Sequence, residues 1–200
     1  GPTGSGTTTT MAALLDMINT DRSKHIITVE DPIEYLHKSK RCLVQQRQII
    51  AHTEGFARAL KASLREDPDI IVVGELRDRE TISLAMTAAE TGHLVYGTLH
   101  TTNAVNTINR VLDSFPPEQA PQIRTMLSES LRGVISQRLV PRLDNRGRIP
   151  VMEILAVTPA VGNLIRDGKT FQIPGLMQVG KSHGMQMLDD SLEDLLSRRL

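Results

Sequence analysis

The chain has 200 residues and a mass of 22.1 kDa, enough for one compact domain or for one domain with a small appendage. Lysine plus arginine and aspartate plus glutamate both number 23, so the chain lacks the positive surplus of a nucleic-acid carrier, and its 2% of aromatic residues argue against base-stacking platforms. Cys42 is the single cysteine, which excludes an internal disulfide framework and a multi-cysteine metal site.

The chain opens on a glycine-rich stretch that leads directly into a predicted helix. Residues 1–8 read Gly-Pro-Thr-Gly-Ser-Gly-Thr-Thr, and apolar residues at 11, 14, 15 and 18 then recur at helical spacing. Gly1, Gly6 and Thr8 fall in register with the phosphate-binding loop G-x-x-x-x-G-K-[ST], whose backbone N–H groups surround a phosphate. We expect ATP to bind here, with the Thr8 hydroxyl on Mg²⁺, through these residues: Gly4, Ser5, Gly6, Thr7, Thr8 and Thr9.

The lysine position of this loop holds Thr7. A lysine there reaches the β- and γ-phosphates as a point charge, and a charge-assisted hydrogen bond contributes about 1.5–3 kcal/mol. Threonine is short and uncharged, so the sequence predicts very weak hydrolysis. An alternative interpretation is that residues 1–6 are a cloning scar followed by a threonine-rich tail, which predicts a disordered start that contacts no phosphate.

The first half of the chain alternates predicted strands and helices. Strands are expected at 25–30, 69–75 and 93–99, and a mixed segment at 42–50 is expected to form an edge hairpin. Helices are expected at 54–65, capped by Thr53, at 78–91, capped by Asp78, and at 104–113, capped by Asn103. This order is typical of a parallel sheet covered on both faces, and we assign residues 1–115 to a nucleotide-binding core.

The pattern changes after Pro116 and Pro117. One long helix is predicted over 118–139, followed by a polar turn at 144–147, a strand at 149–157 and a helix at 159–166 opened by Thr158. Residues 168–184 read as a loop, and a terminal helix over 188–200 is expected to be capped by Asp189 or Asp190. Residues 116–200 are thus predicted to be a helical C-terminal part with one or two strands, continuous with the core.

Polar residues follow each predicted parallel strand, where ligands of such sheets bind. Glu30, Asp31 and Glu34 follow the first strand, Glu75 and Arg77 the second, and His100 and Thr101 the third. We expect Glu30, Glu75 and His100 to meet beside the glycine-rich loop, with Glu75 aligning the attacking water. The alternative, purely structural roles are that Glu30 and Asp31 cap a turn and that His100 is a core histidine. His93, at the start of a strand, suits either interpretation.

Four blocks in this order resemble a known family. They are residues 1–6, residues 28–34 (Thr-Val-Glu-Asp-Pro-Ile-Glu), residues 70–78 (Ile-Ile-Val-Val-Gly-Glu-Leu-Arg-Asp) and residues 92–101 (Gly-His-Leu-Val-Tyr-Gly-Thr-Leu-His-Thr). They are similar to the Walker A, Asp box, Walker B and His box of the secretion ATPase superfamily of type II secretion and type IV pili. Further stretches, among them residues 115–119, 128–137 and 172–174, resemble the pilus retraction ATPases of that superfamily, which serve twitching motility.

The resemblance implies an α/β, RecA-like P-loop ATPase core, truncated at the Walker A loop and without the N-terminal domain of the family. It implies that Glu30 and Glu75 are the Asp-box and Walker-B carboxylates around Mg²⁺ with Thr8, and that His93 and His100 sense the γ-phosphate. It also implies a homo-hexamer that works at the cytoplasmic face of the inner membrane with a pilus platform protein. No transmembrane segment, signal peptide or nucleic-acid partner is expected.

Two substitutions favour a second hypothesis. Thr7 replaces the Walker A lysine, and Gly162 stands where the Ala-Ile-Arg-Asn-Leu stretch of the retraction family has its arginine. The alternative function is therefore a catalytically dead partner subunit that provides a ring interface to an active ATPase.

Overall fold

The computed structural model describes residues 1–144 and 146–199, so Asn145 of the predicted turn and Leu200 of the predicted terminal helix lie outside the described residues. The chain forms two compact units. The sheet unit is Thr7–Leu99, and the hairpin unit combines Gly1–Gly6 with His100–Leu200. The division predicted at residue 115 is a different one and stays a prediction.

The sheet unit is built on four parallel strands in the order β2-β1-β3-β4. Its elements in chain order are α1 (Thr7–Asp21), β1 (His25–Glu30), β2 (Leu43–Gln48), α2 (Phe56–Ser63), β3 (Ile70–Val73), α3 (Arg79–Glu90) and β4 (Leu94–Gly97). Strand β3 is buried along its whole length, as its uninterrupted run of Ile and Val predicts for a central parallel strand.

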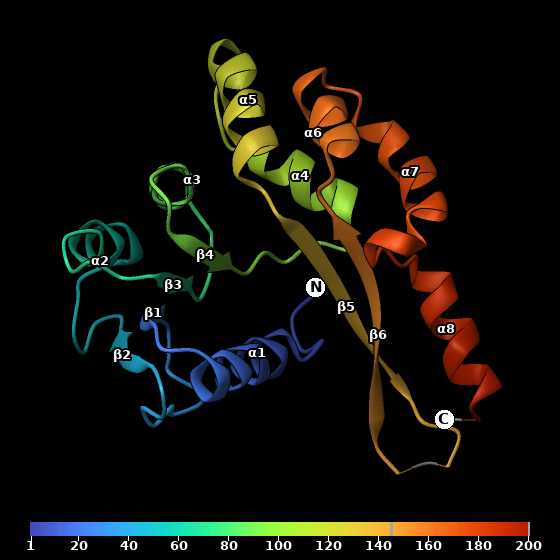
Figure 1. Cartoon of the computed structure of the whole chain (residues 1–200), viewed down its shortest axis with the longest axis horizontal. Coiled ribbons are helices and arrows are strands. Elements are labelled where there is room, and N and C mark those ends of the chain that lie inside the picture. The colour runs from blue at the N-terminus through green and yellow to red at the C-terminus, as the bar shows by residue number, and fades with distance from the viewer. Residues whose placement is uncertain (145, 200) are drawn as a thin grey trace. The chain divides into compact units, whose positions relative to one another are not determined.

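Helices cover both faces of this sheet (Figure 1). Successive side chains of a strand point to opposite faces, and the core divides accordingly. On one face Leu15 of α1 packs with Ile26, Ile70 and Val72. On the other face the packed residues are Leu60 of α2, Ala85 and Ala88 of α3, and Ile71 and Val73 of β3. The predicted α/β sandwich is therefore present in this unit.

The segment after β1 differs from its prediction. Instead of an edge hairpin, residues 43–48 form strand β2, which pairs with β1 in parallel, with Thr28 opposite Gln46 and Glu30 opposite Gln48. A parallel pair needs a crossover, and residues 31–42 provide one without a helix. The buried Asn19 of α1 holds this crossover, because its amide donates to the Lys38 carbonyl (2.8 Å) and accepts from the Lys40 amide (3.0 Å).

The predicted caps of two helices had different outcomes. Asp78 caps α3 as expected, and its carboxylate accepts from the Thr81 amide (2.9 Å) and hydroxyl (2.7 Å). Burial alone would raise the pKa of Asp78, but these hydrogen bonds outweigh it and hold the pKa below its ordinary value. Helix α2 has Gly55 as its N-cap, because the Thr53 hydroxyl donates to the Gly55 carbonyl instead of accepting from the helix.

The hairpin unit contains a two-stranded antiparallel sheet with helices. Its elements after His100 are α4 (Ala104–Leu112), η1 (Pro117–Gln119), α5 (Ala120–Ser130), β5 (Gly133–Pro141), β6 (Arg148–Ala156), α6 (Pro159–Arg166), η2 (Thr170–Gln172), α7 (Ile173–Val179), η3 (Lys181–His183) and α8 (Leu188–Ser197). The caps that Asn103 and Thr158 were expected to provide for α4 and α6 are present. Their side chains accept from the amides of Asn106 and Val161.

The long helix predicted over 118–139 was wrong. Helix α5 ends at Ser130, and the chain continues as β5, which pairs with β6 from Gly133 opposite Ala156 to Pro141 opposite Arg148. A Cβ at Gly133 would lie 2.9 Å from the Leu155 carbonyl oxygen, so β6 approaches the backbone closely there. Cross-strand pairing of the β-branched Val134 and Ile135 thus overrides a helical periodicity that continues through the sequence.

The last third of the chain holds a helix that the sequence did not predict. Helix α7 lies within residues 168–184, which were expected to form a loop. Pro174 and Gly175 lower the helical propensity of this stretch, which is why the sequence predicted no helix. Proline is nevertheless tolerated in the first turn of a helix, where Pro174 lies. Helix α8 has Met187 as its N-cap, not Asp189 or Asp190, and the Asp190 carboxylate accepts from the Met187 amide (3.3 Å).

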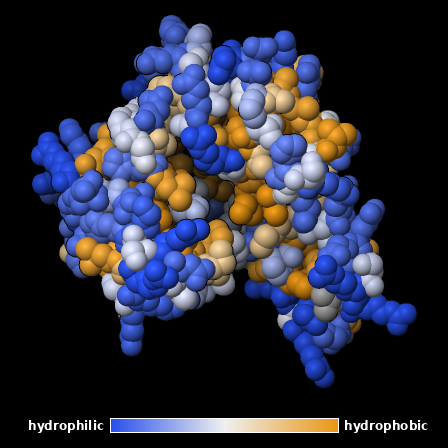
Figure 2. All heavy atoms as spheres, viewed as in Figure 1, coloured by the Kyte–Doolittle hydropathy of each residue, from blue (hydrophilic) through white to orange (hydrophobic). Residues whose placement is uncertain are grey.

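The surface of the chain is mixed in polarity. Figure 2 shows hydrophilic residues along much of the margin of the viewed face, with hydrophobic residues in groups between them. Among the described residues, no helix combines the length and the apolar character that crossing a membrane requires.

Gly162 lets α5 and α6 pack closely. A Cβ at this position would lie 3.0 Å from the Ser128 carbonyl oxygen, a backbone atom that cannot move aside as a side chain does. The arginine of the retraction family would therefore require α5 and α6 to separate.

We expect Gly162→Ala to destabilise the chain by about 1–2 kcal/mol, because the steric cost exceeds the gain in helical propensity. Gly175→Ala in α7 is the matched control, since a Cβ there meets no atom within 4 Å, and it should stabilise by about 0.5–1 kcal/mol. Urea unfolding of both variants measures the difference. Equal effects of the two substitutions would contradict close packing at Gly162.

Candidate functional site

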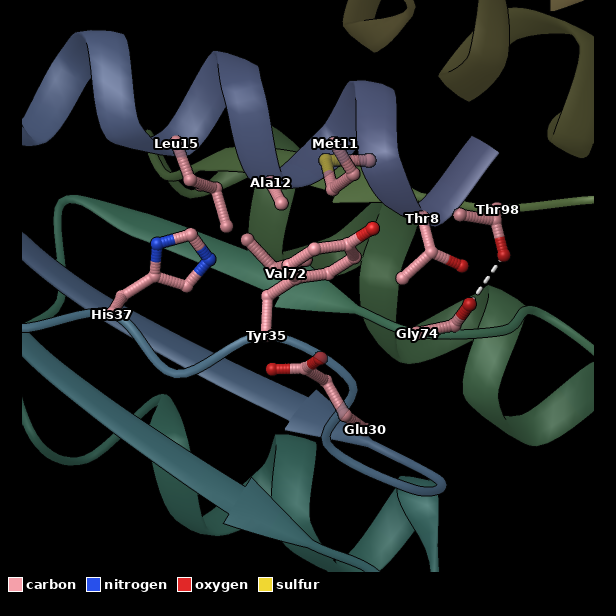
Figure 3. A pocket seen from close by; sticks show the side chains of 10 residues that line it. All are labelled: Thr8, Met11, Ala12, Leu15, Glu30, Tyr35, His37, Val72, Gly74 and Thr98. Atoms are coloured by element: carbon pink, nitrogen blue, oxygen red, sulfur yellow. Dashed lines mark hydrogen bonds between the residues drawn. The ribbon is translucent and has the colours of Figure 1, made fainter. Parts of the chain in front are cut away.

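The carboxyl ends of β1, β3 and β4 lie at one edge of the parallel sheet. A cavity of about 40 Å³ opens there, lined by Thr8, Met11, Ala12, Leu15, Glu30, Tyr35, His37, Val72, Gly74 and Thr98 (Figure 3). Figure 3 shows the side chains of α1 on one side of this cavity and Glu30 on the opposite side. The structure therefore brings together Thr8 and Glu30, 22 positions apart in the sequence, with the backbone of Gly74.

Thr8 is held by the segment that follows β1. Its hydroxyl donates to the Glu34 carboxylate (3.0 Å), and the next hydroxyl, that of Thr9, is 2.9 Å from the Tyr35 hydroxyl. With its proton engaged by Glu34, the Thr8 oxygen keeps lone pairs for a cation. The sequence indicated Glu34 only as one of the carboxylates after the first strand, and gave no signal for Tyr35.

Glu30 is fixed by two neighbours. Its carboxylate accepts from the Thr28 hydroxyl (2.6 Å) and from the Gln46 side-chain amide (3.0 Å). The parallel register places Gln46 opposite Thr28, so its role depends on the β1–β2 pairing that the sequence did not predict. The geometry orients the carboxylate without neutralising it.

Glu75 follows β3 directly after Gly74. Its carboxylate is 2.6 Å from the Arg77 guanidinium, and its side chain is 19% exposed. The strand end is tied to β4, because the Thr98 hydroxyl donates to the Gly74 carbonyl and the Leu76 amide donates to the Thr98 carbonyl (3.0 Å). This places the Glu75 backbone at the same edge as Glu30.

The two predicted histidines belong to different units, and only the position of His93 in the sheet unit is described. His93 immediately precedes β4, and its Nδ1 is 3.0 Å from the Ala88 carbonyl oxygen and 3.2 Å from the Thr91 hydroxyl. It therefore lies at the amino edge of the sheet, opposite to Glu30, because β4 runs parallel to β1 and begins at Leu94. His100 is exposed and belongs to the hairpin unit.

The glycine-rich loop is tightly turned within the hairpin unit. Gly4 and Gly6 have positive φ angles of 78° and 82°, a backbone conformation that favours glycine. The Ser5 amide donates to the Pro2 carbonyl (3.1 Å), and the Gln137 side-chain amide of β5 donates to the Ser5 carbonyl (2.6 Å). A Cβ at Gly1 would lie 2.4 Å from the Gln137 carbonyl oxygen, so residue size is restricted there as well.

The donor set of the loop suits an anion. Ser5 is buried, and its hydroxyl has no hydrogen-bond partner among the residues that the structure describes. An unsatisfied buried hydroxyl in a loop with two left-handed glycines fits a phosphate. No group of three or more His, Cys, Asp or Glu side chains suited to a metal ion occurs within residues 1–144 and 146–199. Mg²⁺ bound with a nucleotide normally takes only one or two protein oxygens, which matches Thr8.

Comparisons with known proteins identify the family of the chain. The profile of the family described as Type II/IV secretion system protein matches residues 1–156. The chain belongs to this family. The family resemblance and the α/β fold with a parallel sheet are thereby confirmed.

Similar members of the family have names that refer to pili. The chain is 56% identical over all its length to the type IV pilus retraction ATPase PilT of Pseudomonas aeruginosa, and 54% identical to the twitching motility protein of Neisseria gonorrhoeae. It spans 58% and 54% of those proteins. A crystal structure of the pilus retraction motor PilT with bound ADP matches with a TM-score of 0.86 and 50% identity, over 96% of this chain and 59% of that one.

The Thr8–Glu34 hydrogen bond is open to a direct test. Thr8→Val and Glu34→Ala should show a coupling of about 1 kcal/mol in a double-mutant cycle of unfolding free energies, and Thr8→Ser should retain the stability. Thr20→Val, at the other end of α1, paired with Glu34→Ala is the control. It should be additive, because the Thr20 hydroxyl donates to the Asp16 carbonyl and accepts from Lys40, not from Glu34. Additivity of the Thr8 and Glu34 variants would rule out the contact.

Proposed function

We propose that this chain is the ATP-hydrolysing part of a type IV pilus retraction motor and uses ATP with Mg²⁺. The observation that carries the proposal is the shared cavity of Thr8 and Glu30 at the carboxyl edge of the sheet, where Gly74 and Glu75 leave β3. Similarity to retraction and twitching proteins over the whole chain supports the pilus assignment. Because the chain spans less than two thirds of these relatives, the activity of a complete motor is part of the proposal.

The nucleotide site combines the loop with the start of α1. In the proposal, backbone N–H groups of Gly4, Ser5 and Gly6 bind the phosphates, and Thr7, Thr8 and Thr9 continue the site into the helix. Bound Mg²⁺ would neutralise negative charge on the phosphates. The Thr8 oxygen would hold it, with Glu30 and Glu75 acting directly or through water.

Hydrolysis in this proposal depends on Glu75. Its carboxylate orients a water molecule and accepts a proton from it, the water oxygen bonds to the γ-phosphorus, and the bond to the bridging oxygen of ADP breaks. His100 is proposed to sense the γ-phosphate, as the family resemblance implies. The position of His93 at the amino edge does not support a role beside Glu30.

The rest of the motor is proposed from the family resemblance. Subunits would assemble as a homo-hexamer, peripheral to the cytoplasmic side of the inner membrane, and act on a pilus platform protein. Nucleotide-driven closure against neighbouring subunits would convert hydrolysis into motion.

Thr7 favours a second candidate function, a catalytically dead partner subunit. A chain without the lysine at this position lacks its charge-assisted bond to the phosphates, so transition-state stabilisation falls sharply. Such a subunit would contribute its interface to a ring driven by an active relative.

Restoring the lysine separates these functions. Thr7→Lys should raise magnesium-dependent ATP turnover by at least about tenfold, since one charge-assisted bond to the phosphates is regained. Phosphate release measures turnover, and calorimetry measures ATP binding. Met17→Lys, which adds the same charge at an exposed position of α1, is the control and should leave turnover unchanged. A folded Thr7→Lys protein with no gain in turnover would leave the partner-subunit function as the better one.

A further inference from the structure

The Glu75–Arg77 ion pair joins the proposed water-activating carboxylate to an exposed cation. Arg77 Nε lies 2.6 Å from Glu75 Oε2. The Glu75 side chain is 19% exposed, whereas that of Arg77 is 63% exposed. The carboxylate is therefore enclosed at the sheet edge, and the guanidinium reaches it from the solvent side.

The backbone on both sides of Arg77 is anchored. The Leu76 amide donates to the Thr98 carbonyl, and the Leu76 side chain packs so closely over Gly97 that a Cβ there would lie 2.6 Å from Leu76 Cδ1. Asp78 caps α3 immediately afterwards. The backbone of Arg77 is thus held in place, and the long side chain allows the guanidinium to change partners.

The charge balance of this edge calls for a cation once a nucleotide binds. Carboxylates surround it, at Glu30 and Glu34 beside Thr8 and at Glu75 after β3. Thr7 brings no positive charge where the phosphate-binding motif has its lysine. A guanidinium binds both phosphate and carboxylate, because its planar fork matches the geometry of either group.

We propose that Arg77 pairs with Glu75 in the nucleotide-free chain and moves to the terminal phosphate of bound ATP. There its guanidinium takes the electrostatic place of the lysine that Thr7 replaces. This inference rests on the proposed function, because it requires that ATP binds at this edge.

A cycle of variants at positions 7 and 77 tests the exchange of partners. The dissociation constants of a non-hydrolysable ATP analogue with Mg²⁺ and of ADP with Mg²⁺ are measured by calorimetry for the chain itself, Arg77→Gln, Thr7→Lys and the double variant. With Thr7 present, Arg77→Gln should weaken binding of the analogue about tenfold and leave ADP binding within twofold, because only the analogue carries the terminal phosphate. With Thr7→Lys present, the same change should cost at most about threefold.

Two further variants complete the design. Arg79→Gln removes the same charge two residues away, at the exposed start of α3, and should change neither constant by more than twofold. Arg77→Lys keeps the charge without the fork and should restore about half of the lost binding free energy. Circular dichroism of every variant verifies the fold.

The outcomes separate the two proposals. Equal effects of Arg77→Gln on the analogue and on ADP, or equal effects with either residue at position 7, would overturn the role of Arg77 while leaving ATP binding intact. Folded Thr7 and Thr7→Lys proteins that bind neither nucleotide would overturn the proposed function and this inference together.

Discussion

The structure of the sheet unit depends on the burial of β1 and β3 between helices on both faces. Ile26, Ile71 and Val73 are fully or almost fully buried, and each such side chain contributes about 1.5–3 kcal/mol when it leaves water. A strand covered on both faces cannot slip by one residue without exchanging the side chains of its two faces. The carboxyl ends of the strands are therefore fixed beside one another. The polar residues that directly follow these ends lie at the same edge of the sheet.

The carboxylates that follow β1 and β3 are held by different kinds of neighbour. Glu30 is held by hydrogen bonds from Thr28 and Gln46, so its carboxylate is oriented by neutral groups. Glu75 is held by a cation, Arg77, on an anchored backbone. One carboxylate is thus positioned permanently, and the other is positioned by a contact that a phosphate is able to take over.

The departures from the family pattern also have different physical meanings. Gly162 lies where α5 approaches α6 closely, so a larger residue at this position requires the two helices to shift. Nothing in the structure explains Thr7, the first residue of α1. The missing lysine charge at Thr7 affects phosphate binding and hydrolysis. The missing arginine at Gly162 affects the packing of α5 against α6.

Local sequence patterns predicted the structure correctly where interactions between residues near in sequence, or the rules of parallel strand pairing, determine it. The apolar run of β3, the cap at Asp78 and the convergence of Thr8 with Glu30 follow from alternation, capping chemistry and parallel pairing. Tertiary structure alone decided that residues 43–48 pair in parallel with β1, that residues 133–141 leave the helical pattern for a hairpin, and that Glu34 and Gln46 hold Thr8 and Glu30. These outcomes depend on partners distant in sequence, whose backbone pairing and close approach outweigh the preferences of the residues themselves.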